Sequence, residues 1–188
     1  MSKFNSKEKG SENERKVCGQ LSLWVSDYTR DDVFWRAAMS GGRANLPQRL
    51  QKGQTFAAQV GDISAVHELG LPLLRLFNIE CKFYKDLMLD APIFGVIGEV
   101  GQFWTKLLGE CEQHHKIKGG VIRQNRKTEL FATTQKGKQI FDTAATEPIV
   151  WTGILPTLDC CLTPFRELLI KVPFKRLLPH CKQLRRSI

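Results

Sequence analysis

The residues of this sequence that could do chemistry together are Asp62 and, after a short connection, Glu80-Cys81-Lys82. On an extended strand alternate side chains share a face, so Glu80 and Lys82 point the same way and Cys81 points to the other. If Asp62 begins the neighbouring antiparallel strand, its carboxylate approaches Glu80 closely enough for both to share a divalent cation, which removes their repulsion. The Lys82 ammonium would then orient or help deprotonate a water and balance charge on a pentavalent phosphorane.

The elements that must position these residues are visible as hydrophobic periodicities. Apolar residues recur every three or four positions over 11–25 and again over 99–115, which predicts two amphipathic helices. Ser11 is a candidate N-cap of the first helix, with Glu14 completing a capping box, and Gly119-Gly120 is expected to close the second. Short β-branched or aromatic runs predict strands over 33–39, 62–67, 76–84, 121–124 and 130–133. The runs 62–67 and 76–84 are expected to form a β-hairpin.

These elements give a helix, three strands, a helix and two strands, with a flexible tail over residues 1–9 before them. We therefore expect a core domain over 10–140 and a basic C-terminal extension over 141–188. Five prolines cut the extension into short pieces, so its topology is not predicted. Between Ser40 and Asp62 lies an irregular stretch, expected to be a mobile basic loop, that carries Arg43, Arg49 and Lys52.

Composition narrows the class of protein. A chain of 188 residues fits one domain, and its formal net charge of +9 favours an anionic partner, nucleic acid first. Its apolar runs are too short and too interrupted for a membrane helix, and its N-terminus lacks the pattern of a secretory signal, so we expect a cytoplasmic protein without a membrane partner. The six cysteines lack the spacing of a disulfide scaffold and are expected to be reduced thiols.

Asp62, Glu80 and Lys82 resemble the acidic, acidic, basic signature of the PD-(D/E)xK nuclease superfamily, with Gly61 standing where the motif has Pro. Within it, the chain is similar to archaeal-type Holliday junction resolvases and equally to phage-encoded nucleases. The matching segments are Gly10, Glu14-Arg15, Ser40-Gly41-Gly42, Gly61-Asp62-Ile63 and Ile79-Glu80-Cys81-Lys82. The resemblance covers about residues 10–134. It implies an α/β fold with a restriction-endonuclease-like core, in which helices flank a central mixed β-sheet.

The resemblance also implies roles for individual residues. Asp62, Glu80 and the backbone carbonyl of Cys81 would hold Mg²⁺ or Mn²⁺, and Lys82 would serve the attacking water. Glu14 would reach the same metal directly or through water. Arg15 or Ser40 would contact the scissile backbone, and Gln124 is a further candidate for DNA contact. The basic residues Arg43, Arg49 and Lys52 of the loop could neutralise phosphates.

These observations lead to a metal-dependent DNA endonuclease, including a resolvase-like role in phage recombination or DNA processing. A homodimer would suit a branched or double-stranded substrate. Other interpretations stay open: Glu80 and Lys82 could be a surface ion pair with Asp62 capping a turn, and Glu14 could serve only the capping box. The protein could also bind DNA without cleaving it, or use its basic C-terminal segment to dock an acidic partner.

Overall fold

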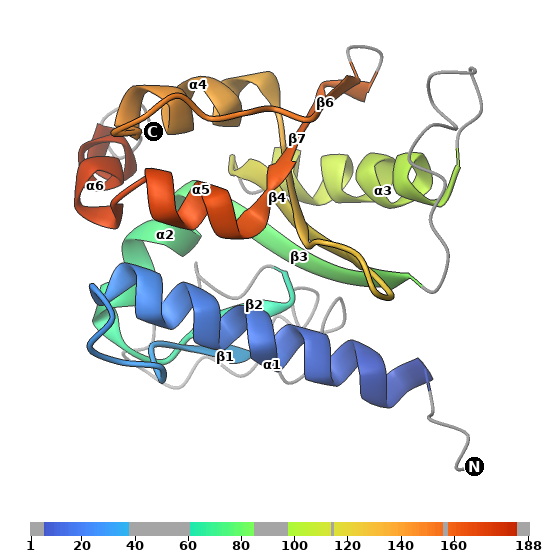
Figure 1. The fold of residues 1–188 in the computed structure, drawn as a ribbon, viewed down its shortest axis with the longest axis horizontal. Coiled ribbons are helices and arrows are strands. Elements are labelled where there is room, and N and C mark those ends of the chain that lie inside the picture. Colours follow the sequence, from blue (N-terminus) through green and yellow to red (C-terminus); the bar gives the residue numbers. More distant parts are fainter. Residues whose placement is uncertain (1–5, 38–60, 85–97, 114, 156–157, 184–188) are drawn as a thin grey trace.

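The structure, a computed structural model, describes residues 6–37, 61–84, 98–113, 115–155 and 158–183 (Figure 1). The basic loop expected between Ser40 and Gly61 lies almost wholly outside these residues, as do its cations Arg43, Arg49 and Lys52. Among the described helices, none combines the length and the apolar character that crossing a bilayer requires.

The first helix, α1 (Ser6–Val25), starts earlier than its hydrophobic pattern indicates. Its first turn therefore overlaps the tail expected over residues 1–9. The predicted apolar face is buried, with Val17 and Leu21 almost inaccessible to solvent. Near its end the indole of Trp24 donates a hydrogen bond to the Val172 carbonyl at 2.6 Å, which ties α1 to the C-terminal part of the chain.

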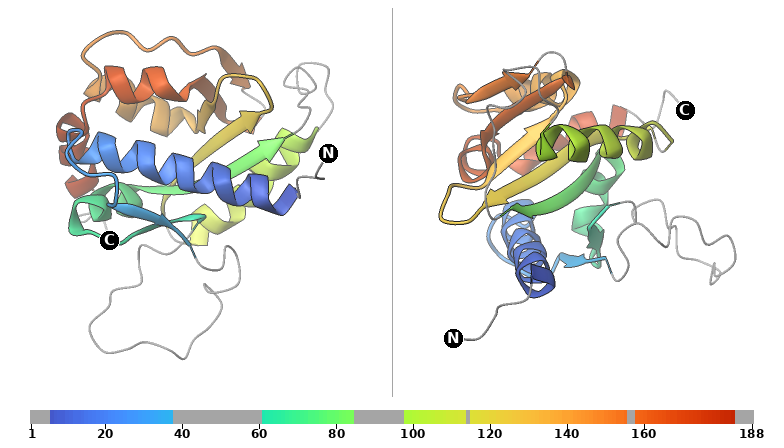
Figure 2. Two further views of the ribbon diagram at one scale, coloured as in Figure 1. Left: turned by 60° about the horizontal axis from the view of Figure 1, so that its bottom comes forward. Right: turned by 90° about the vertical axis from the view of Figure 1, so that its right-hand side faces the viewer.

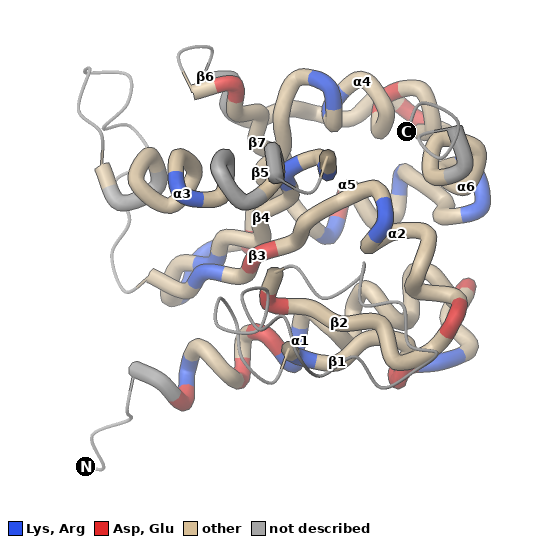
Figure 3. Tube along the Cα trace, turned by 180° about the vertical axis from the view of Figure 1, so that it is seen from behind, with Lys and Arg blue, Asp and Glu red and all other residues tan. Residues whose placement is uncertain are grey.

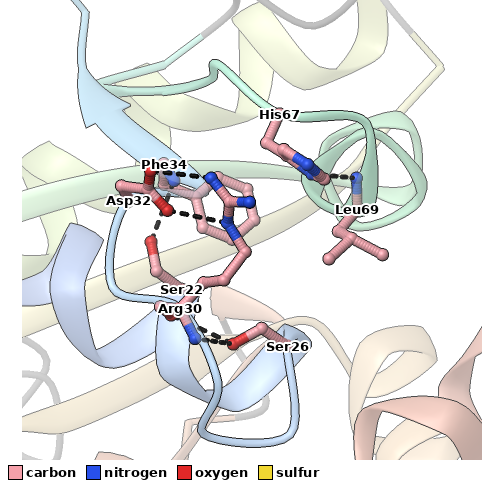
Figure 4. Close-up of polar contacts among 7 residues, drawn as sticks. All are labelled: Ser22, Ser26, Arg30, Asp32, Phe34, His67 and Leu69. Atoms are coloured by element: carbon pink, nitrogen blue, oxygen red, sulfur yellow. Dashed lines mark hydrogen bonds and ion pairs between the residues drawn. The ribbon is translucent and has the colours of Figure 1, made fainter.

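A tight turn leads from α1 into β1 (Phe34–Arg36), which pairs antiparallel with β2 (Ile63–Ala65) in a two-stranded sheet. Figure 4 shows the contacts that hold this turn. The Phe34 amide donates to the Ser22 hydroxyl at 2.9 Å, and the Arg30 guanidinium grips the Asp32 carboxylate through two bonds of 2.8 Å. The turn thereby fixes β1 against α1.

The hairpin predicted for 62–67 and 76–84 is wrong. A 3-10 turn at Glu68–Gly70 and the helix α2 (Leu71–Leu76) separate the two strands, and the second, β3 (Phe77–Tyr84), pairs in parallel with β4 (Ile117–Gln124). The run Leu71-Pro72-Leu73-Leu74 forms a helix because Pro72 occupies its first turn, where no amide is needed, and the leucines on one face are buried.

The main sheet has five strands in the order β3-β4-β5-β7-β6, with β5 spanning Leu130–Thr133. The prediction that Gly119 and Gly120 close the preceding helix α3 (Glu99–Gln113) is wrong. Both glycines lie inside β4. A Cβ atom at Gly119 would lie 3.2 Å from the Phe131 ring, and one at Gly120 would lie 3.2 Å from the Phe103 ring. The glycines therefore let aromatic rings pack closely on both faces of β4.

The chain beyond β5 forms α4 (Gln135–Ala144), β6 (Gly153–Leu155), β7 (Cys160–Pro164), α5 (Phe165–Lys171) and α6 (Phe174–Gln183). The boundary expected between a core over 10–140 and an extension over 141–188 falls inside α4. Strand β7 inserts between β5 and β6 and pairs antiparallel with both. The basic C-terminal segment thus shares the sheet of the residues before it.

Helices cover both faces of the five-stranded sheet, and Figure 2 shows α1 and α3 on opposite sides of it. One core cluster joins α1, α2, α4, α5 and α6 to residues such as Phe77, Ile79 and Phe131. The other joins α3, through Phe103 and Trp104, to the opposite face of β4, β5 and β7. The expected α/β architecture with a central mixed sheet flanked by helices is confirmed.

All six cysteines are free and buried. Burial raises the pKa of Cys18, Cys160 and Cys181 from about 9 to about 12. Below pH 9 both the folded and the unfolded chain hold neutral thiols, whereas between about pH 9 and 12 only the unfolded chain ionises them, so stability is lost as the pH rises.

We therefore expect the native protein to resist an aromatic disulfide reagent at pH 8 and to release six thiol equivalents only in guanidinium chloride. Absorbance of the released thiolate measures both states. Rapid stoichiometric labelling of the native protein would contradict the buried placement.

Candidate active site

Strand β3 carries the glutamate and the lysine of the predicted motif. Ile79 and Cys81 are buried in the cluster beneath α1, whereas Glu80 and Lys82 are half-buried. The Lys82 ammonium lies 5.6 Å from the centroid of the Phe103 ring in α3. Because alternate residues of a strand share a face, Glu80 lies on this same α3 side.

Asp62 lies along the edge of β3 that β4 does not occupy. Gly61 forms a parallel bridge with Ile79, and the Asp62 amide donates to the Ile79 carbonyl at 3.2 Å. The Cys81 amide in turn donates to Asp62 Oδ2 at 2.9 Å. These bonds hold the Asp62 carboxylate beside the segment Ile79 to Cys81, level with Glu80 in between. The antiparallel neighbour that the sequence predicts is thus replaced by a single parallel bridge.

The Asp62 carboxylate is almost entirely buried, with 4% of the residue exposed, and it makes no ion pair within the described part of the chain. Burial, followed by the negative charge of Asp62, raises the pKa of the Cys81 thiol well above its ordinary value. A buried carboxylate with one amide donor is costly unless a cation compensates it. The chemistry of this site therefore fits a hard divalent cation that prefers oxygen ligands.

Helix α1 adds a second carboxylate, that of Glu14. Burial raises its pKa above 4.5, and the nearby charge of Asp62 raises it further, while Arg36 and Lys82 lower it. The charges of Asp62 and Lys82 are therefore close enough to Glu14 to change its pKa. The capping-box interpretation of Glu14 is wrong, because α1 begins at Ser6 and places Ser11 and Glu14 inside the helix.

Arg36, at the end of β1, is the member of this cluster that the sequence did not reveal. Its Nε donates to Glu14 Oε2 at 3.0 Å, and both side chains are largely shielded, at 34% and 18% exposure. A usable signal was present: Arg36 is the one charged residue of the apolar run 33–39. A charge inside such a strand indicates a partner on a neighbouring element.

A polar cluster around Glu129, in the turn between β4 and β5, fixes the position of α1 relative to the sheet. The carboxylate of Glu129 accepts bonds from Lys16 at 2.6 Å and from Gln20 at 3.2 Å, and Arg123 lies 3.7 Å from it. Lys16 and Gln20 follow Glu14 on the same helix. The cluster therefore helps to hold Glu14 over the edge of β3.

Of the other predicted site residues, the structure describes Arg15 and Gln124. Arg15 is exposed on α1, and Gln124 is half-buried at the end of β4, paired with Tyr84. Ser40, Arg43, Arg49 and Lys52 lie outside the described residues. Across the described part of the chain, no group of three His, Cys, Asp or Glu side chains meets in a way that could hold a metal. The carboxylates of Glu14, Asp62 and Glu80 are therefore not brought together as a set of three in this structure.

Gly61 sits at a turn that only glycine fits. Its φ of +103° is in the region that L side chains rarely adopt, and an added Cβ would lie 2.7 Å from the Ile79 carbonyl oxygen and closer still to Asn78 Oδ1. Proline fixes φ near −65°, so the Pro of the PD-(D/E)xK motif does not fit this backbone. The glycine is what brings Asp62 against β3.

We expect Gly61→Ala to lower the free energy of unfolding by roughly 2 kcal/mol or more, and Gly61→Pro to lower it further. Urea unfolding followed by circular dichroism measures both. Gly19→Ala is the matched control, because a Cβ there meets nothing within 4 Å and alanine favours the helix. Equal stabilities of Gly61→Pro and the wild type would contradict this geometry.

The Glu14–Arg36 pair leads to a second prediction. Arg36→Gln leaves Glu14 beside Asp62 with one counter-charge fewer, so we expect a loss of about 1 kcal/mol of stability. Glu14→Gln in the same chain should restore part of that loss. A double-mutant cycle of unfolding free energies tests the coupling; strictly additive effects would show that the two groups do not interact.

Comparison with known families identifies the family of the chain. The profile of a family described as "Phage putative PDDEXK endonuclease" matches residues 5–159, which include every residue placed in the site above. No curated protein and no solved structure gives a match.

Proposed function

The chain belongs to this family of phage PDDEXK endonucleases, and from that membership we propose that it hydrolyses phosphodiester bonds of DNA with the help of Mg²⁺ or Mn²⁺. The observation that carries the proposal is the placement of the Asp62 carboxylate on the edge of β3, held by the Cys81 amide beside Glu80 and Lys82. We assign Asp62, Glu80 and Lys82 to the acidic, acidic, basic motif of PD-(D/E)xK nucleases.

The proposed ligands are the carboxylates of Asp62 and Glu80 and the carbonyl oxygen of Cys81, with Glu14 reaching the ion directly or through water. Mg²⁺ commonly uses one or two carboxylates and keeps several waters, so such a small protein donor set suits it. When bound, the ion would polarise the phosphoryl oxygen and stabilise the departing 3′ oxygen.

The remaining side chains of the site have their own proposed tasks. Lys82 holds the attacking water, and its charge opposes the negative charge that develops on the phosphate. Arg36 holds the Glu14 carboxylate in place and offsets part of the charge that Glu14 and Asp62 bring together. Phe103, beside Lys82, provides an apolar wall against which the ammonium rests.

The substrate we propose is branched or double-stranded DNA, including four-way junctions processed during phage recombination in the bacterial cytoplasm. The net charge of +9 supports an anionic polymer as the partner. Two copies of the chain would place two such sites on the two strands of a duplex, so we propose a homodimer as the active form. Arg15 and Gln124 are the described candidates for contact with the DNA backbone.

The test is cleavage of a panel of four-way junction, flap, nicked, linear duplex and single-stranded DNA, with and without divalent metal. We expect the wild type to cut at least one of them in Mg²⁺ or Mn²⁺, and Lys82→Ala to lower the rate roughly 100-fold or more. Lys106→Ala, an exposed position on α3, is the control for lost charge.

Binding in EDTA separates the alternatives. Lys82→Ala should still bind the cleaved substrate when no metal is present. A wild type that binds these DNAs in EDTA but cuts none of them in metal would make the protein a DNA-binding member that has lost turnover. Full activity in Lys82→Ala would remove this lysine from the reaction.

A further inference from the structure

The turn between β4 and β5 is rich in positive charge. Between Ile117 and Thr133 the sequence has four basic residues and a single acidic one, Glu129, which Lys16 and Arg123 already contact. Arg126 and Lys127, at the tip of the turn, are exposed and form no ion pair with any other described residue. Their charges are therefore available to an anion outside the fold.

The register of the sheet places this turn beside the active site. Lys82 is paired with Ile122 and Tyr84 with Gln124, and the Asn125 amide donates to the Tyr84 carbonyl at 3.1 Å. Figure 1 shows the turn next to the end of β3, and Figure 3 shows blue segments gathered there. At about 3.3 Å per strand residue, the tip lies on the order of 10 Å beyond Lys82.

The backbone of the turn supports a role outside the fold. The Lys127 amide donates to the Gln124 carbonyl at 3.2 Å, and Arg126 between them has a φ of +59°. Glycine and asparagine adopt this left-handed conformation readily, whereas arginine does so at a cost. An arginine with no ion-pair partner in the described fold, at a position where glycine would be relaxed, indicates that its side chain serves binding.

We propose that Arg126 and Lys127, with Gln124 at the base of the turn, bind the phosphate backbone of the DNA roughly three nucleotides from the phosphate cleaved at Lys82. The spacing follows from the distance along the sheet and the 3.4 Å rise per nucleotide of one strand. This inference rests on the proposed function and adds to it a second anchoring point. Phosphate contacts of this kind fix the register of a nucleic acid without reading its sequence.

The experiment measures binding of the full chain to a fluorescent 30-base-pair duplex and a four-way junction in EDTA, by anisotropy over a range of NaCl concentrations. The variants are Arg126→Gly, Arg126→Lys and the double variant Arg126→Gly with Lys127→Ala. The control, Arg75→Ala with Lys136→Ala, removes the same charge from exposed positions near the opposite ends of β3 and β4.

For the double variant we expect roughly tenfold weaker binding and a salt slope smaller by about 1.8, the value for two lost phosphate contacts. Arg126→Lys and the control should bind like the wild type. Arg126→Gly should weaken binding while its thermal midpoint stays equal or rises, because glycine relaxes the turn. That combination distinguishes a binding role from a structural one.

The proposal is overturned if the double variant keeps the affinity and salt slope of the wild type, or if the control loses as much affinity as the double variant. A lower thermal midpoint in Arg126→Gly would also overturn it, because it would assign the arginine to folding. Cleavage by the wild type in metal is scored separately. Loss of binding in the variants together with an inactive wild type would keep the binding turn and reject the proposed hydrolysis.

Discussion

The hydrogen bond from the Cys81 amide to Asp62 Oδ2 is the contact on which the candidate site depends. The donor is an amide on the edge of β3 that β4 does not occupy. The bond holds the buried Asp62 carboxylate level with Glu80, although no strand pairs with β3 along this edge beyond the bridge at Gly61 in the described part of the chain. Two features make it possible. The positive φ of Gly61 turns the chain toward β3, and the parallel bridge to Ile79 fixes the height at which it arrives. The backbone bridge between Gly61 and Ile79 and the hydrogen bond from the Cys81 amide to Asp62 thus place Asp62 beside the motif residues of β3.

Holding carboxylates together in this way opposes folding, and the surrounding elements offset the cost. Helix α1 positions Glu14 near Asp62, and two sets of contacts hold this helix. Glu129 accepts hydrogen bonds from the middle of α1, and Trp24, near its end, donates a hydrogen bond to the Val172 carbonyl. Both partners come from the chain after α3. The segment after β5 is therefore part of the support of the site, because α1 packs against the core that α5 and α6 help to build.

The sequence predicts those parts of the structure in which one strong pattern acts over many residues. The helices over 11–25 and 99–115 and the strands at 121–124 and 130–133 are confirmed within a few residues. The hairpin fails because Leu71 to Leu76 is too short an apolar run for periodicity to separate helix from strand. The chain beyond β5 could not be derived from the pattern of prolines, since Pro164 is the last residue of β7, Pro173 directly precedes α6 and Pro179 lies inside α6. The motif located Asp62, Glu80 and Lys82, but the pairing of Glu14 with Arg36 depends on how α1 crosses β1, which no local pattern encodes.

The parallel pairing of β3 with β4 also determines which segment lies next to the candidate site. In a parallel pair both strands end at the same edge, so the last residues of β3, just beyond Lys82, lie beside the last residues of β4. The segment that follows β4 therefore lies near the motif because of the strand pairing. Here β4 is followed by a short basic turn into β5, whose antiparallel pairing keeps the turn close to that edge. The hairpin expected from the sequence pairs β3 only with the strand at 62–67. It therefore gives no reason to place the turn after β4 near Lys82.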